Sequence, residues 1–328
     1  MSFIKKYNIY FPQHVIADNI LHPKGRKNNH SVAYVDEDII TLAYSASAGI
    51  GKEAGAVLFA TTTPVFKGRY HASYLAGLLG LPDGITALDM GTTNRAGTDA
   101  LLLAGTLINS GKCDNVLVVA SDVSYPAIGK ETRTPFGHGA VAMIVSKDNG
   151  IAQITGTASY SEALAEEFTY KGEQVKYDPR FARTAGFKNN MKKVLAGLAP
   201  KGIDSLIINS AYVKLIFSTL KKAGYDMEKQ VAPDKLVPRF GYLGAAHGLL
   251  RLAHAMENVS GTSVIVDYNN GSNVITIEVP KLSPRILDDS GNKTPIACYQ
   301  DYLTLRKQGK FEGRGYKSIE MFSSEMMQ

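Results

Sequence analysis

Only two cysteines and no tryptophan occur among the 328 residues. Cys113 and Cys298 are too few for a disulfide framework or a zinc cage, and their scarcity predicts a reducing compartment. No apolar run approaches the ~18 residues that a membrane-spanning helix needs. The start of the chain also lacks the apolar core of a signal peptide. We therefore expect a cytoplasmic protein without a membrane segment.

An excess of either charge is also lacking. The 36 Lys and Arg residues against 30 Asp and Glu residues give a formal net charge of +6. The cations are scattered until the C-terminal segment, so no basic stripe predicts nucleic-acid binding. A phosphorylated acidic ligand and an ordinary solvated surface both account for this mild excess. The seven histidines show no metal-ligand spacing, and His247 and His254, one heptad apart, indicate core or interface positions rather than a metal site.

The sequence contains an internal repeat. "AGTDALLLAGTLINSGKCDNVLVV" resembles "LGAAHGLLRLAHAMENVSGTSVIV", with Leu101 matching Leu249 at an offset of 148. The same offset aligns "GAVLFATT" (55–62) with "IDSLIINS" (203–210). Near-continuous apolar strands alternating with helices are typical of sheets covered on both faces. Helices expected at 97–109 and 245–257 are apolar nearly all round, which predicts that they lie between layers.

These patterns predict an α/β fold, a five-layer α-β-α-β-α sandwich of two pseudo-twofold-related halves. We place the halves at 1–150 and 151–283. A basic, aromatic segment at 284–328 has little apolar periodicity and is expected to dock on something else.

Several motifs, in order and spacing, carry a resemblance that covers almost the whole chain. They are "NIYFPQHVIA", "VDEDIITLAYSAS", "ALDMGTTNRAGTDAL", "FGHGAVAMIV", "SLIINSAYVKLIFSTLKKAG" and "PRFGYLGAAHGLLRLA". The chain resembles the thiolase superfamily and, within it, the 3-hydroxy-3-methylglutaryl-CoA synthase family. The resemblance implies a thiolase-type fold and an ancestral chemistry on coenzyme A thioesters.

Active members of that family use a cysteine nucleophile, a histidine and an asparagine that stabilise the oxyanion, and a glutamate acid/base. By resemblance, the cysteine falls on Asn94, the histidine on Asn209, the asparagine on Tyr242 and the glutamate on Thr62. A lysine beyond the histidine is retained as Lys214, a candidate for binding the cofactor. An amide is not a nucleophile at neutral pH, and Asn94 is a favoured helix N-cap. All four chemical positions are therefore interpreted as vestigial, and whether a coenzyme A thioester still enters the cavity stays open.

Other groups of residues give weaker evidence of a catalytic or binding site. Ser121, Asp122 and His138 occur in a hydrolase-like order, but no Gly-x-Ser-x-Gly elbow is present. "GTLINSGKC" has the wrong spacing for a phosphate-binding loop, and it ends a helix rather than opening one. Thr92 or Thr93 would need a base that Asn209 does not provide.

Two functions remain open. The first is a non-catalytic subunit, a homo- or heterodimer through its fold. It scaffolds a complex with a thiolase or acyltransferase subunit and a small zinc-ribbon/OB-fold protein. "YQDYLTLRKQGKFEG" resembles the segment that leads toward the OB-fold partner in such assemblies, which makes Tyr299, Tyr302, Arg306 and Lys307 candidate partner-binding residues. The second is an enzyme with non-cysteine chemistry on a coenzyme A thioester, either C–C bond formation or retro-aldol cleavage, in which Tyr242 takes part.

Overall fold

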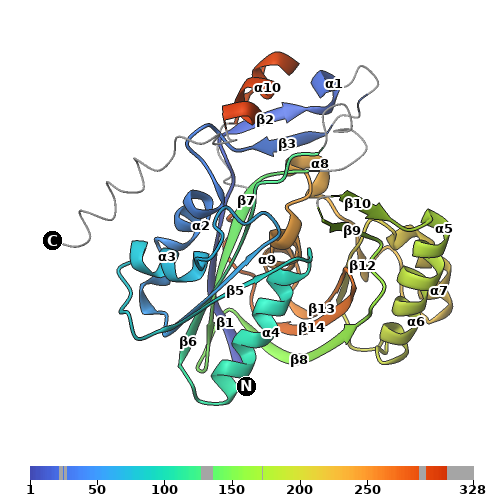
Figure 1. Ribbon diagram of the computed structural model, residues 1–328. Helices are drawn as coiled ribbons and strands as arrows, with labels where there is room; N and C mark the ends of the chain where they lie inside the picture. Colours follow the sequence, from blue (N-terminus) through green and yellow to red (C-terminus); the bar gives the residue numbers. More distant parts are fainter. Residues whose placement is uncertain (22–24, 26–27, 127–135, 172, 288–292, 309–328) are drawn as a thin grey trace.

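The computed structural model describes residues 1–21, 25, 28–126, 136–171, 173–287 and 293–308 (Figure 1). Its centre is a ten-stranded mixed sheet made of two five-stranded halves. The first half runs in the order β5 (Thr86–Gly91), β4 (Ala56–Thr61), β6 (Asn115–Asp122), β7 (Gly139–Ser146) and β1 (Ser2–Tyr10). The second runs β8 (Ala152–Ser161), β14 (Gly271–Val279), β13 (Gly261–Tyr268), β11 (Ser205–Asn209) and β12 (Val231–Ala232). The halves meet where the start of β1 pairs with the start of β8.

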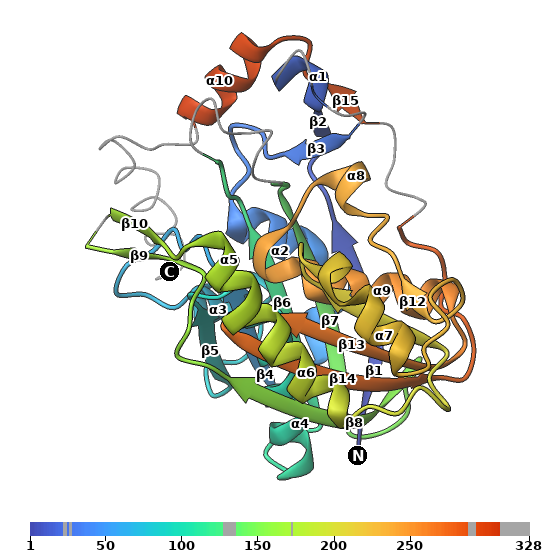
Figure 2. The ribbon, with the colours of Figure 1, turned by 90° about the vertical axis from the view of Figure 1, so that its right-hand side faces the viewer.

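Helices form three layers around these halves. α2 (Ile39–Ser47) and α3 (His71–Leu78) cover the outer face of the first half. α4 (Ala96–Asn109) and α9 (His247–Asn258) lie between the halves and contact each other. α6 (Asn189–Ala196) and α7 (Phe217–Lys222) cover the outer face of the second half, as Figure 2 shows. The expected five-layer α-β-α-β-α sandwich is confirmed, with α4 and α9 as its adjacent central helices.

The inner strands β4, β6 and β11 are mostly apolar because both of their faces are buried. Along β4, Leu58 faces the central helices while Phe59 faces α2 and α3. Along β11, Ile207 faces the central helices while Leu206 faces the outer layer. The offset of 148 pairs Leu58 with Leu206, two residues that face different layers, so the gapless alignment of the strands is wrong by one residue. A slip of one residue exchanges the two faces of a strand, and a strand that is apolar on both faces does not reveal the slip in its sequence.

The central helices approach closely because glycines face the contact. A Cβ on Gly97 would lie 2.3 Å from the carbonyl oxygen of Ala245. A Cβ on Gly248 would lie 2.5 Å from a carboxylate oxygen of Asp267. A larger residue at Gly97 would press on the backbone of the second half, whereas one at Gly248 would collide with Asp267 of its own half and crowd Thr98 of α4 at 3.1 Å.

The segment after residue 283 is not a separate tail in its described part. β15 (Thr294–Pro295) pairs with β2 (His14–Ala17), which pairs with β3 (Asn29–Val32). α10 (Tyr299–Gln308) packs on this small sheet through Tyr302, whose side chain is fully buried beside Ile16, Val32, Phe136 and Ile296. The expectation that residues 284–328 form an extension beyond the body is therefore wrong for residues 293–308. The sequence missed this packing because β2 and β3 lie near the opposite end of the chain from α10.

The remaining elements are short. They are α1 (Asp18–Leu21), η1 (Gly51–Glu53), β9 (Glu167–Tyr170), β10 (Glu173–Lys176), α5 (Pro179–Phe181), the π-helix η3 (Ala182–Lys188), η4 (Val213–Ile216), α8 (Val237–Phe240) and η5 (Gly244–Ala246). Within the described ranges, no helix has both the length and the apolar content to cross a bilayer.

Candidate functional site

The site is built on the start of α4, where the turn from β5 is strained. Thr92 has φ of 71°, a left-handed conformation that is unfavourable for a β-branched residue. α4 begins at Ala96, and the N-cap position is held by Arg95, which makes no side-chain capping bond. The expectation that Asn94 caps the helix is therefore wrong. The Ala96 amide donates to the carbonyl oxygen of Thr93 at 2.9 Å, so the backbone turn satisfies this amide itself. Asn94 is partly exposed, and its correspondence to the cysteine nucleophile of the resemblance stays a prediction.

A buried carboxylate connects this helix to the next vestigial position. Asn209, the last residue of β11, donates through Nδ2 to Asp267 Oδ1 at 2.8 Å. Thr98, in the first turn of α4, donates through Oγ1 to Asp267 Oδ2 at 2.7 Å. Asp267 is 1% exposed. Burial raises the pKa of this carboxyl to about 6, although the hydrogen bonds from Thr98 and Asn209 act in the opposite direction.

Tyr242 joins the same group. Its hydroxyl makes a side-chain hydrogen bond with Asn209, and its ring packs on His247 with centroids 4.5 Å apart. Burial raises the pKa of this hydroxyl, and the nearby charges of Asp267 and Asp122 raise it further. The phenol is therefore held neutral. It can donate a hydrogen bond but is a poor base.

Thr62 is held by a second buried carboxylate, Asp122, at the end of β6. Asp122 accepts from the Thr62 hydroxyl at 2.9 Å, from the Thr62 amide at 2.7 Å and from the Thr61 hydroxyl at 2.7 Å. The Ala245 amide, just before α9, donates to it at 2.6 Å. Burial raises the pKa of Asp122, and these hydrogen bonds oppose the rise. The Thr62 hydroxyl is therefore engaged in a structural contact, and its correspondence to the acid/base glutamate of the resemblance stays a prediction.

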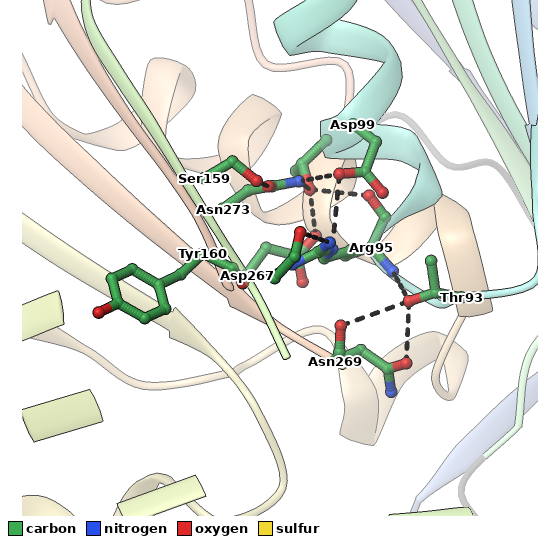
Figure 3. A network of polar contacts seen from close by, with 10 residues as sticks. Thr93, Arg95, Asp99, Ser159, Tyr160, Asp267, Asn269 and Asn273 are labelled. Carbon is green, nitrogen blue, oxygen red and sulfur yellow. Dashed lines mark hydrogen bonds and ion pairs between the residues drawn. The ribbon is translucent and has the colours of Figure 1, made fainter. Parts of the chain in front are cut away.

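Arg95 fixes the start of α4 to the far ends of two strands (Figure 3). Its guanidinium donates to the carbonyl oxygen of Tyr160 at 3.0 Å and pairs with Asp99 at 3.5 Å. Asn273, on β14, donates to Asp99 at 2.7 Å and to Thr98 at 3.0 Å. These contacts tie the start of α4 to β8 and β14 of the second half.

The two groups expected at the oxyanion positions are engaged in hydrogen bonds within the site. An acyl transfer needs a nucleophile and two donors aimed at the thioester oxygen. In this site, the Asn209 amide is committed to Asp267 and the Tyr242 hydroxyl to Asn209. We derive no acyl-transfer step for this chain.

The other candidates fall in different places. Lys214 lies exposed on η4, beyond Asn209, where its assignment as a cofactor-binding residue stays a prediction. His138 accepts from the Ala33 amide at 2.8 Å and contacts the Ser124 carbonyl oxygen at 3.1 Å, so it does not pair with Ser121 or Asp122. Burial lowers the pKa of His138 to about 4. The hydrolase-like order therefore forms no triad.

The four candidate partner-binding residues of α10 differ in burial and contacts. Tyr302 is buried inside the chain and is unavailable to a partner, which corrects its assignment. Arg306 lies over the ring of Tyr125, 5.5 Å from its centroid. Tyr299 contacts Tyr302, with ring centroids 5.9 Å apart. The side chain of Lys307 lies outside the described residues.

A cavity of about 600 Å³ lies beside this site rather than in it. It follows the carboxyl ends of β11 and β12, and its lining includes Ser210, Phe217, Lys221, Asp234 and Arg251. None of the four vestigial positions lines it. In the part of the chain that the structure describes, no group of three His, Cys, Asp or Glu residues is placed to hold a metal ion.

Comparison with known proteins assigns the family. A sequence model described as 3-Oxoacyl-[acyl-carrier-protein (ACP)] synthase III matches residues 88–163, the stretch that runs from within β5 through α4, β6, β7 and β8. The hydroxymethylglutaryl-CoA synthase of Pyrobaculum aerophilum is 31% identical over 308 residues, covering 85% of this chain and 87% of the relative. The chain belongs to the hydroxymethylglutaryl-CoA synthase family.

Two solved structures agree with this fold. PksG, a HMG-CoA synthase from Bacillus subtilis, superposes with a TM-score of 0.80 at 16% identity, covering 94% of this chain and 88% of that one. A HMG-CoA synthase complexed with CoA superposes with a TM-score of 0.77 at 21% identity, covering 93% and 90%. The resemblance drawn from the motifs is thereby confirmed for both the family and the thiolase-type fold.

Sequence reasoning missed the buried carboxylate Asp267 and the clamping role of Asp122. Each lies at the carboxyl end of an apolar strand, Asp122 as the last residue of β6 and Asp267 as the last but one of β13. Nothing in the sequence tells such an aspartate from a solvated one, because its burial depends on α4 and α9 meeting above it.

Proposed function

We propose that this chain is a non-catalytic hydroxymethylglutaryl-CoA synthase-like subunit that scaffolds an acyl-CoA-processing complex. Its partners would be a thiolase or acyltransferase subunit, which supplies the reactive cysteine, and a small zinc-ribbon/OB-fold protein. One observation carries the proposal. Where the family's mechanism requires free donors around a thiolate, Asn209 is hydrogen-bonded both to Tyr242 and to Asp267, and Asp267 also accepts from Thr98 in the first turn of α4.

The protonation states of the side chains at the site support the same interpretation. A neutral, buried phenol cannot replace a histidine base at neutral pH, and the Asn94 amide cannot accept an acyl group. The two cysteines lie elsewhere: Cys113 follows the far end of α4, and Cys298 is exposed just before α10. No residue movement within the described fold would assemble the missing nucleophile.

We also propose dimerisation through β5. This strand lies at one end of the ten-stranded sheet, with β4 on one side, and Leu88 in its middle is 37% exposed. An uncovered strand edge is a template for pairing with another chain. Pairing with a second copy or with a thiolase subunit of the same fold would extend the sheet.

Purification of the native complex tests the proposal. A tagged full-length chain, expressed from its own locus, should bring down stoichiometric thiolase-like and zinc-ribbon/OB-fold subunits, identified by mass spectrometry. Acyl transfer should require the cysteine of the thiolase subunit. A chain that elutes alone and processes coenzyme A thioesters by itself would contradict the proposal.

One observation favours the second function, an enzyme that acts on a coenzyme A thioester without a cysteine. The side-chain amide of Asn209 links the Asp267 carboxyl, whose pKa is raised to about 6, to the Tyr242 hydroxyl. A carboxyl with that pKa is suited to proton transfer near neutral pH. Incubation of the isolated chain with 3-hydroxy-3-methylglutaryl-CoA, followed by chromatography of the thioesters, tests cleavage. Product formation that is lost in Tyr242→Phe would favour the enzyme.

A further inference from the structure

Exposed aromatic residues of the molecule gather on one hairpin. Four rings lie exposed within fourteen residues of β9, β10 and α5: Phe168 (39%), Tyr170 (60%), Tyr177 (43%) and Phe181 (48%). The rings of Phe168 and Tyr177 are 6.4 Å apart, and those of Tyr177 and Phe181 are 5.9 Å apart. We call these four residues the hairpin surface. Three of its rings form a continuous row, whereas scattered exposed rings would need no explanation.

This hairpin is an appendage with a fixed base. β9 and β10 form a separate two-stranded sheet joined by four residue pairs, and such a sheet is marginally stable unless it packs on something. Its base is held by Glu166, which accepts from the Tyr268 hydroxyl at 2.9 Å and, through its carbonyl oxygen, from the Tyr177 amide at 3.1 Å. Figures 1 and 2 both place β9, β10 and α5 together at the periphery of the second half. The rings are therefore held outward by a fixed support.

The same stretch concentrates positive charge. Residues 168–193 contain seven cations against two carboxylates, Glu173 and Asp178. Two of the cations form ion pairs with acids just before the stretch, Lys176 with Glu167 and Lys193 with Glu162, and Arg183 interacts with the carboxylate of Glu166 and lies 5.8 Å from the centre of the Tyr212 ring. The five cations besides these two lysines are all exposed: Lys171, Arg180, Arg183, Lys188 and Lys192. Lys171 also lies 5.3 Å from the centre of the Tyr170 ring.

We propose that the hairpin surface is the docking face for an acidic protein partner, and this inference rests on the scaffolding function proposed above. Aromatic rings and arginine are enriched at the centres of protein interfaces, and they carry most of the binding energy. The surrounding cations select a partner of opposite charge and accelerate its association. Tyr302 of α10 is buried and cannot contact a partner, whereas the four rings of the hairpin surface are exposed to solvent.

Reconstitution with defined subunits tests the inference. Binding of the full-length chain to the thiolase and OB-fold subunits that co-purify with it is measured by titration calorimetry at two salt concentrations. Tyr170→Ser/Phe181→Ser should weaken binding about tenfold or more, as expected for two interface anchors. Lys171→Glu/Arg180→Glu should weaken it further at low salt and abolish most of its salt dependence.

Matched controls use an exposed tyrosine and an exposed lysine of the first half. Tyr44→Ser, on α2, and Lys147→Glu, after β7, should leave the affinity unchanged. Thermal melts check that each variant is folded. Equal affinity of the wild type and both hairpin variants for intact partners would overturn the inference while leaving the scaffolding function standing.

Three further outcomes would also overturn it. Dissociation of a dimer of this chain by the hairpin variants, seen in sedimentation runs, would make the surface a self-interface. Wild-type binding to phosphatidylserine vesicles or to a single-stranded oligonucleotide, abolished by Lys171→Glu/Arg180→Glu, would assign the surface to a different class of partner. Failure of the wild type to bind any subunit would defeat the proposed function itself.

Discussion

Replacing Asp267 with asparagine should remove a pH dependence of stability that this buried carboxyl creates. The introduced asparagine can keep the local bonds, because its carbonyl oxygen accepts from Asn209 while its amide donates to Thr98, whose hydroxyl already lies 2.9 Å from the Arg95 carbonyl oxygen. The variant therefore removes the charge with little change of shape.

The magnitude follows from linkage. The folded pKa of Asp267 is about 6, against about 3.9 for an unfolded aspartate. The folded state therefore holds this proton to a higher pH than the unfolded state does. The stability that the proton contributes is present at low pH and is lost as pH rises through the folded pKa. Between pH 4.5 and pH 7.5 the loss from this group is about 2 kcal/mol.

Urea unfolding of the wild type and Asp267→Asn at pH values across this window measures the effect. The difference in unfolding free energy should change by about 2 kcal/mol in favour of the variant as pH rises. Asp148→Asn, at an exposed aspartate, should run parallel to the wild type. Parallel curves for Asp267→Asn and the wild type would refute the burial argument.

Three other changes test the site and the core. Asn94→Cys restores a thiol at the start of α4 but leaves Asn209 and Tyr242 in the oxyanion positions; losing one oxyanion donor typically costs ~10²–10³ in rate. We expect at most slow acylation by acetyl-CoA and no 3-hydroxy-3-methylglutaryl-CoA, measured by intact mass and chromatography, and product formation would show that the site was never dead. Tyr302→Ser empties a fully buried site between α10 and the β2–β3 sheet and should cost about 3 kcal/mol in urea unfolding; an unchanged midpoint would mean that α10 does not pack there. Gly97→Ala places a Cβ 2.3 Å from the Ala245 carbonyl oxygen and should lower the melting temperature, whereas Gly84→Ala, which meets nothing within 4 Å, should not.

The order of elements and the layering followed from the sequence because both depend on local patterns. Apolar runs such as 116–120 and helices such as 97–109 predict buried strands and sandwiched helices wherever they occur. Motif order then identified the family, whereas the hydrogen bond between Asn209 and Tyr242 was not predicted.

The predictions that were wrong concern features set by contacts between segments, which the sequence pattern does not show. The face of Leu206 is set by its pairing with β12 and β13, so an offset read from apolar letters was one residue off. Tyr302 looked like an exposed anchor because its partners, among them Ile16 and Val32, lie at the other end of the chain. Asn94 lost its expected capping role because the backbone of Thr93 makes the turn instead.

We propose that this chain keeps the thiolase-type fold but performs no acyl transfer of its own. Incubation of the purified wild-type chain with acetyl-CoA, followed by intact-mass spectrometry under denaturing conditions, tests it most directly. A synthase of the family with its cysteine serves as the positive control. The account predicts an unmodified mass for this chain at every time point. A stoichiometric acetyl adduct on any residue would contradict it.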